Sequence, residues 1–272
     1  MAGAIKEDIS LKEKGPQVCV LKTDGINCDK ETVNAFAIAG GRPRTVHVNE
    51  LRAGQENLRN YQILAIPGGF SYGDDVASGK ILALELNSYL GDQINEFAQR
   101  RKGLVLGVCN GFQVLVRTGL LPFGSMGEME VTLTNNDSGH FECRWINLKV
   151  EGNNDCAFLG EMNGVVSYQV AHGEGKLFTS SEKLEEIENN NLVVFRYCDA
   201  LGNPTQEYPL NPNGSLNAIA GITDPTGRIL GLMPHPERFV RKMQHPNWRR
   251  LPGLEPQGLQ IFQKMVNYAS QM

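Results

Sequence analysis

The chain has 272 residues, of which 41% are hydrophobic and 21% charged, and its formal net charge is −4 at pH 7. This balance is typical of a globular protein with a substantial core, and it gives no electrostatic reason to expect nucleic acid or an anionic membrane as a partner. The sequence contains no apolar run of the length that spans a bilayer.

The N-terminal residues 1–15 are predicted to be a solvated leader, because they mix acidic and basic side chains and lack the apolar segment of a secretion signal. Six cysteines are scattered along the chain without a CxxC pair or the spacing of metal ligands. We interpret them as reduced thiols of a cytoplasmic protein rather than as three disulfides, since a chain with its own core needs no such cross-links.

Strands and helices are predicted to alternate over the first 120 residues. Short apolar runs predict strands at 18–21, 45–48, 62–66 and 104–106. Helical spacing of apolar residues predicts helices over 30–40, which ends on two glycines, over 78–101, and from 110 to about 119. Such alternation favours parallel strands joined by right-handed crossovers, with the chemistry at the carboxyl ends of the strands.

The second half is predicted to add further strands to the same sheet. Strand-like runs occur at 131–134, 141–150, 165–170, 192–198 and 218–223. The turn at 224–227 predicts a hairpin that leads to His235, and a last helix is predicted over 257–272. We interpret residues 16–272 as a single domain.

Cys109 lies where an apolar strand meets a helix, in the stretch Gly107-Val108-Cys109-Asn110-Gly111-Phe112-Gln113. Glycines two places before and after a nucleophile allow the sharp turn of the Gly-x-Ser-x-Gly elbow. The positive end of the helix dipole favours the thiolate, and the backbone N–H of Asn110 can face an oxyanion. On this stretch alone, a buried structural cysteine is an equal alternative.

A second stretch, Pro234-His235-Pro236-Glu237, favours the catalytic interpretation. The following proline holds His235 in extended geometry, so the side chains of His235 and Glu237 point the same way. The carboxylate can then fix the tautomer of an imidazole that takes the thiol proton. A surface histidine beside a solvated carboxylate is the ordinary alternative for such a pair, but it is the weaker one beside a cysteine elbow.

Together these motifs resemble the class I, triad-type glutamine amidotransferases, whose pattern is a Gly-x-Cys-x-Gly elbow followed far downstream by His-x-Glu. Within that class, the chain is similar to the glutaminase subunits of phosphoribosylformylglycinamidine synthase, an enzyme of purine synthesis. The matching stretches are 21–29, 67–74, 107–113, 136–144, 171–175 and 234–238.

The resemblance implies an α/β fold, flavodoxin-like, with an open, mostly parallel sheet and helices on both faces. It implies a catalytic triad of Cys109, His235 and Glu237. It also implies an oxyanion hole from the backbone N–H groups of Gly69 and Asn110, and contacts to glutamine from Gly68, Gln113 and His172. From the residues alone, Gln113 could be an exposed helical glutamine, and His172, which with Glu174 is predicted to lie in a Gly-punctuated loop, could be a surface residue.

The resemblance further implies that the chain has no cofactor of its own. A separate synthetase subunit would use ATP and Mg²⁺ to convert formylglycinamide ribonucleotide to formylglycinamidine ribonucleotide with the ammonia, and a small bridging subunit is usual. The segments 208–212 and 244–256 look like extensions of the family core, and basic residues between 238 and 250 could dock an acidic partner or form a solvated face. Two alternatives stay open: a DJ-1/PfpI-like hydrolase or stress protein, and a catalytically silent regulatory subunit.

Overall fold

The computed structural model describes residues 15–152 and 156–272. The predicted leader, apart from Gly15, lies outside these residues. A nine-stranded sheet runs through the molecule in the order β2-β1-β3-β4-β11-β10-β9-β6-β7. The first five pair in parallel: β2 (Arg42–His47), β1 (Gln17–Lys22), β3 (Ile63–Ile66), β4 (Leu104–Val108) and β11 (Ile229–Leu232).

The remaining sheet pairings are antiparallel. They join β11 to β10 (Ile219–Thr223), β9 (Val193–Cys198), β6 (Glu142–Val150) and β7 (Val165–His172) in turn. A separate two-stranded sheet pairs β5 (Thr132–Asn135) with β8 (Glu174–Phe178). The predicted strands and the hairpin before His235 are therefore confirmed. The second half of the chain extends the sheet, except that the strand predicted over 131–134 forms β5 in the separate sheet and does not join the large one.

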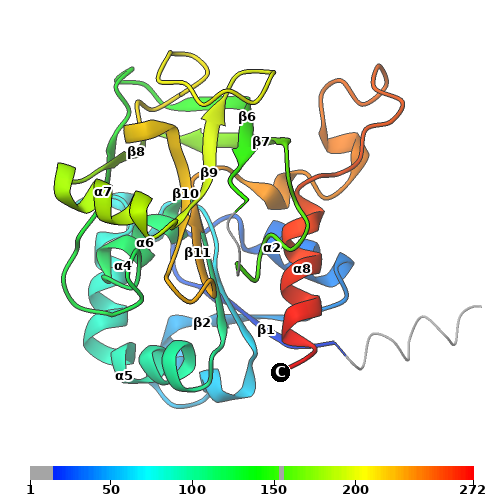
Figure 1. Cartoon of the computed structure of the whole chain (residues 1–272). Coiled ribbons are helices and arrows are strands. Elements are labelled where there is room, and N and C mark those ends of the chain that lie inside the picture. Colours follow the sequence, from blue (N-terminus) through cyan, green and yellow to red (C-terminus); the bar gives the residue numbers. More distant parts are fainter. Residues whose placement is uncertain (1–14, 153–155) are drawn as a thin grey trace, which may run out of the picture.

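Helices cover both faces of the sheet, as the resemblance implied. Figure 1 shows α2 (Asp29–Ile38) and α8 (Leu259–Ala269) on one side, with α4 (Lys80–Glu85), α5 (Gly91–Asn95) and α6 (Asn110–Arg117) on the other. The rings of Phe36 and Phe262 meet edge to face with centroids 4.9 Å apart, so α2 packs against α8. Among the described residues, no helix is long and apolar enough to cross a membrane.

Several predicted boundaries were wrong for local reasons. Val48 does not extend β2 but begins α3 (Val48–Arg52), whose first turn is capped by the His47 side chain. The helix predicted over 78–101 is divided, because the backbone of Leu90 leaves the helical region (φ −123°) just before Gly91. Two elements that the sequence analysis did not predict are β8 and α7 (Ser181–Asn189).

The central strands β3, β4 and β11 are buried along their whole length. Continuous apolar runs of this kind are what a parallel sheet covered on both faces requires. Because β4 pairs in parallel with both β3 and β11, the carboxyl ends of the three strands lie side by side. The segments that follow them carry Gly68, Cys109 and His235, so the sheet brings these three residues to one edge.

Candidate active site

Cys109 occupies a strained turn between β4 and α6. Its backbone angles are φ +53° and ψ −107°, a conformation that non-glycine residues rarely adopt. The turn is held by two hydrogen bonds: the Cys109 N–H donates to the carbonyl of Leu232 (2.8 Å), and the Cys109 carbonyl accepts from the N–H of Gln113 (3.1 Å). The strand, turn and helix therefore have the arrangement of a nucleophile elbow.

His235 and Glu237 form a buried pair beside this elbow. Nδ1 of His235 lies 2.5 Å from Oε1 of Glu237, and each residue is only 1% exposed. The backbone N–H of His235 donates to the carbonyl of Gln169 on β7 (2.8 Å), which ties the end of β11 to the antiparallel half of the sheet. His235 is extended (φ −104°, ψ 90°), as the flanking prolines predicted.

The pair sets the charge of the imidazole. Burial alone would lower the pKa of His235, but the charges of Glu237 and then Cys109 outweigh it and raise this pKa well above its ordinary value. The ring therefore favours its protonated form beside Cys109.

Gly68 and Gly69 form the loop that faces the elbow from β3. A Cβ atom on Gly68 would lie 2.7 Å from Cε1 of His235 and 3.4 Å from Cβ of Cys109, so only glycine leaves room for both side chains. Gly69 has a φ of +139° and pairs with Ile26, where a Cβ would lie 2.7 Å from the backbone N of Asn27. The loop thus brings its backbone close to Cys109 and His235, as an oxyanion hole requires.

Asn110 and Gln113 are both buried at the start of α6. Nδ2 of Asn110 donates to Oε1 of Gln113 (3.0 Å) and to Oδ1 of Asp74 (3.1 Å), and Nε2 of Gln113 donates to the carbonyl of Glu174 (2.5 Å). The alternative of an exposed helical glutamine is therefore wrong. Asp74 is half-buried, and burial raises its pKa above the usual range.

His172 ends β7 and is separated by one glycine from Glu174, which begins β8, so neither residue lies in a loop as predicted. The ring is 3% exposed, with Nδ1 3.1 Å from Oδ1 of Asn136. That oxygen also accepts from the N–H of Gly175, so Nδ1 carries the ring proton and Nε2 is left as an acceptor without a partner among the described residues. Burial, and then the charge of His235, lower the pKa of His172 to about 3.

This lowered pKa predicts an acid sensitivity. In the unfolded chain His172 has its ordinary pKa of 6.5, whereas in the folded chain its pKa is about 3. Between these two pH values, the unfolded chain binds a proton at His172 and the folded chain does not. The contribution of His172 to the free energy of unfolding is therefore fully present above pH 6.5. It falls as the pH drops toward 3, by about 2 kcal/mol at pH 5. We expect His172→Asn to remove this contribution to the pH dependence of the free energy of unfolding, measured with urea between pH 5 and pH 8.

The exposed His140 provides the control for this prediction. His140→Asn is expected to keep the wild-type pH dependence of stability, because the ring is exposed to solvent and is not part of the buried site. A His172→Asn variant whose stability fell with acid as steeply as that of the wild type would contradict the assignment of His172 as a buried neutral ring.

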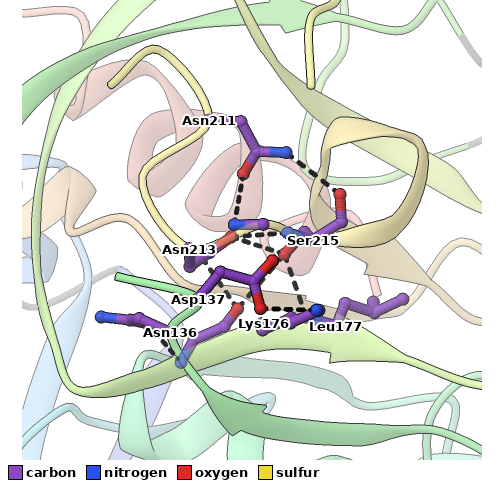
Figure 2. Close-up of polar contacts among 9 residues, drawn as sticks. Asn136, Asp137, Lys176, Leu177, Asn211, Asn213 and Ser215 are labelled. Atoms are coloured by element: carbon purple, nitrogen blue, oxygen red, sulfur yellow. Dashed lines mark hydrogen bonds and ion pairs between the residues drawn. The ribbon is translucent and has the colours of Figure 1, made fainter. Parts of the chain in front are cut away.

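The segment 205–215, which contains the extension predicted over 208–212, is integrated next to the site. Figure 2 shows hydrogen bonds that join Asn211, Asn213 and Ser215. The carbonyl of Asn213 also accepts from the N–H of Asp137, and Oγ of Ser215 accepts from the N–H of Leu177. Nδ2 of Asn213 also donates to the carbonyl of Gly175 (2.8 Å), three residues beyond His172. These buried polar side chains fix β8, so the segment supports the site instead of standing apart from it.

Arg238 also differs from its predicted place in a basic surface cluster. It is partly buried, and its guanidinium donates to Sγ of Cys28 (3.3 Å) and to Oε1 of Gln169 (3.4 Å). Cys28 lies at the start of α2, more than 200 positions before His235, so no local pattern could have placed it at the site. The sequence analysis therefore did not predict that Cys28 and Arg238 lie at the site.

Comparison with known protein families identifies the class of protein. Residues 15–269 match the family model of the CobB/CobQ-like glutamine amidotransferase domain, in agreement with the elbow and the α/β fold. The chain is 48% identical over 255 residues to phosphoribosylformylglycinamidine synthase subunit PurQ of Dehalococcoides mccartyi, covering 93% of this chain and 97% of that protein. The PurQ subunit of Methanococcus maripaludis strain S2 is 42% identical over 267 residues, with the same coverage.

A solved structure agrees with these relatives. The chain is similar to a chain of PurLQS from Thermotoga maritima with a TM-score of 0.70 and 32% sequence identity, over 93% of this chain and 99% of that chain. The chain therefore belongs to the PurQ family, the glutaminase subunits of phosphoribosylformylglycinamidine synthase. This membership confirms the resemblance and overturns the DJ-1/PfpI-like alternative.

Proposed function

We propose that the chain hydrolyses glutamine to glutamate and ammonia with Cys109 as nucleophile, His235 as the group that moves the proton, and Glu237 as the group that orients the imidazole. One observation carries this assignment: the buried His235–Glu237 pair, 2.5 Å apart, follows β11, while Cys109 follows the adjacent strand β4. The neighbouring parallel strands thus present the base and the nucleophile at one edge of the sheet.

In this mechanism, the thiolate of Cys109 attacks the side-chain carbonyl carbon of glutamine. The negative charge that develops on the carbonyl oxygen is stabilised by the backbone N–H groups of Gly69 and Asn110. His235 gives its proton to the departing nitrogen, so that ammonia leaves and a glutamyl thioester remains. The neutral imidazole then takes a proton from water, whose oxygen attacks the thioester to release glutamate and the thiolate.

The proposed contacts to glutamine come from Gly68, Gln113 and His172. Gly68 leaves open the space between the Cys109 and His235 side chains, where a reacting amide must fit. Nε2 of His172 is a buried acceptor, and the amide of the substrate offers the matching N–H donors. Gln113, which is hydrogen-bonded to Asn110, anchors the first turn of the elbow helix.

We further propose that the ammonia passes to a separate synthetase subunit in the cytoplasm. The solved relative carries the name PurLQS, and its PurQ-like chain supports an assembly of three kinds of subunit. The synthetase would bind ATP, Mg²⁺ and formylglycinamide ribonucleotide, and a small subunit would bridge the two. Residues 16–272 of the present chain would act in this complex as one domain.

An electrophilic glutamine analogue tests the nucleophile. We expect the purified chain to gain the mass of one adduct, which peptide mapping places on Cys109 and which excess glutamine prevents. If the adduct forms only after the synthetase is added, the partner completes the site. The exposed Cys143 offers a matched control: Cys143→Ser is expected to label like the wild type, and an adduct on Cys143 or no adduct under either condition would contradict the proposal.

A further inference from the structure

Arg238 directly follows Glu237 and connects the catalytic pair to two other elements of the fold. Its partly buried guanidinium donates to Oε1 of Gln169 on β7 (3.4 Å) and to Sγ of Cys28 at the start of α2 (3.3 Å). Neither acceptor is a carboxylate, so these contacts are not an ordinary surface salt bridge. The mechanism above gives Arg238 no role.

The segment that carries His235 has few backbone donors with which to hold its place. Pro234 and Pro236 have no N–H group. The N–H of His235 donates to the carbonyl of Gln169 (2.8 Å), and the N–H of Arg238 donates back to the carbonyl of His235 (3.3 Å). The Arg238 side chain therefore gives the segment a second attachment to β7, at the same residue that holds the His235 backbone.

Cys28 is a fixed point on the other side of the segment. Its N–H donates to the carbonyl of Gly68 (3.2 Å), and its carbonyl accepts from the N–H (3.0 Å) and Oγ1 (2.8 Å) of Thr32 in the first turn of α2. Its sulfur lies within 4.8 Å of a ring nitrogen of His235 and a carboxylate oxygen of Glu237, and the residue is only 1% exposed. Through Cys28, Arg238 thus connects the catalytic pair to the loop that faces the elbow.

The guanidinium suits this bridging position. It is planar and presents its N–H donors in a rigid fork, so acceptors on two different elements fix its position. A half-buried cation that meets a thiol and an amide adds little to the free energy of unfolding, because its loss of hydration offsets the contacts. The contacts restrict where the following and preceding residues lie more than they stabilise the fold.

We propose that Arg238 is a positioning residue, which holds the His235–Glu237 segment between β7 and the start of α2 so that the imidazole faces Cys109. It acts through Gln169 and Cys28 and not through contact with glutamine. The proposal deepens the proposed function and rests on it. A displacement of a catalytic group by about 1 Å can lower the rate about 100-fold, so the effect belongs in kcat.

The kinetic test replaces Arg238 in the full chain, assayed with its synthetase. Arg238→Met keeps the apolar stem and removes the donors to Gln169 and Cys28. We expect kcat for glutamine hydrolysis to fall about 10- to 100-fold, KM for glutamine to stay within about threefold, and the urea midpoint to stay close to that of the wild type. Product formation from ammonium salt should be unchanged, which shows that the synthetase still binds.

Arg241→Met is the matched control. The exposed Arg241 also connects this segment to α2, but it donates to Oδ1 of Asn34 (3.0 Å) on the surface. We expect this variant to keep wild-type kcat. An equal loss of kcat in Arg241→Met would assign the effect to the basic surface and overturn the proposal, as would an Arg238→Met chain with kcat within about twofold of the wild type.

Gln169→Met provides a second variant, which removes the acceptor on β7 and keeps the backbone carbonyl that holds His235. We expect it to lower kcat as well. The double variant with Arg238→Met should lose no more than Arg238→Met alone, because the contact between the two side chains is then already absent. Losses that multiply in the double variant would overturn the proposed action through Gln169.

Proton NMR gives a readout that needs no glutamine. The proton between Nδ1 of His235 and Oε1 of Glu237, which are 2.5 Å apart, should give a low-field resonance that His235→Asn removes. We expect Arg238→Met to shift or broaden this resonance and Arg241→Met to leave it in place. An unchanged resonance in Arg238→Met would overturn the proposal, whereas a shifted resonance together with a wild-type complex that releases no glutamate would refute the proposed function alone.

Discussion

Cys109→Ala is expected to abolish glutamine hydrolysis, with a loss of at least about 10⁴-fold, because Cys109 is the thiol that the nucleophile elbow presents to the substrate and that forms the thioester in the proposed mechanism. Glutamate release, measured with the synthetase present, checks this. The same complex should still make product when ammonium salt replaces glutamine, since free ammonia bypasses the missing nucleophile. Cys143→Ser, which alters an exposed thiol, is expected to keep wild-type activity with either nitrogen source.

The fold is expected to survive this change, and the backbone strain at Cys109 provides a second readout. A positive φ of +53° in a non-glycine residue costs about 1–3 kcal/mol, and alanine keeps that cost. Glycine adopts such angles freely, although it also gains entropy in the unfolded chain. We therefore expect Cys109→Gly to be inactive but to unfold at higher urea concentration than Cys109→Ala.

Two outcomes would contradict these expectations. Glutamine-dependent turnover by Cys109→Ala above about 1% of wild type would exclude Cys109 as the nucleophile. A Cys109→Gly chain less stable than Cys109→Ala would show that the elbow does not store strain, and the turn would then be an ordinary one.

The parts of the site that the sequence predicted are those encoded by neighbouring residues. The glycines around Cys109 specify a sharp turn, and the prolines around His235 specify an extended dipeptide that aligns it with Glu237. The turn at 224–227 specifies the hairpin that carries His235 to the sheet edge. Each of these signals depends on spacings of one to four residues, which local backbone physics determines.

The parts that the sequence could not predict depend on contacts between distant segments. Asp74 contacts Asn110 across 36 positions, and Cys28 lies beside His235 and Glu237 only because β1 and β11 belong to the same sheet. Burial of His172 likewise follows from the pairing of β7 with β6 and not from the glycines around it. Helix α7 was missed because Ile187 is its one fully buried residue, which leaves too little apolar periodicity to detect.

Gly111→Ala is expected to destabilise the fold by at least about 3 kcal/mol, because a Cβ atom there would lie 1.9 Å from the carbonyl oxygen of Ile66. Alanine favours a helix over glycine by about 1 kcal/mol, so propensity alone predicts the opposite sign. The steric overlap outweighs the gain in helix propensity, because the atom that must move belongs to the backbone of β3 and no side-chain rotation can relieve the overlap. Relief requires α6 to move away from β3, and this movement would also displace Cys109 from His235.

The urea midpoint at constant slope measures the change in stability, and glutamate release by the folded fraction measures the displacement of Cys109. Gly253→Ala is the matched control, because a Cβ at Gly253 meets no atom within 4 Å among the described residues. We expect it to change stability by less than about 0.5 kcal/mol and to keep full activity. Equal midpoints for the two variants would mean that α6 does not approach β3 this closely. The claim that this close approach makes the elbow sharp would then be wrong.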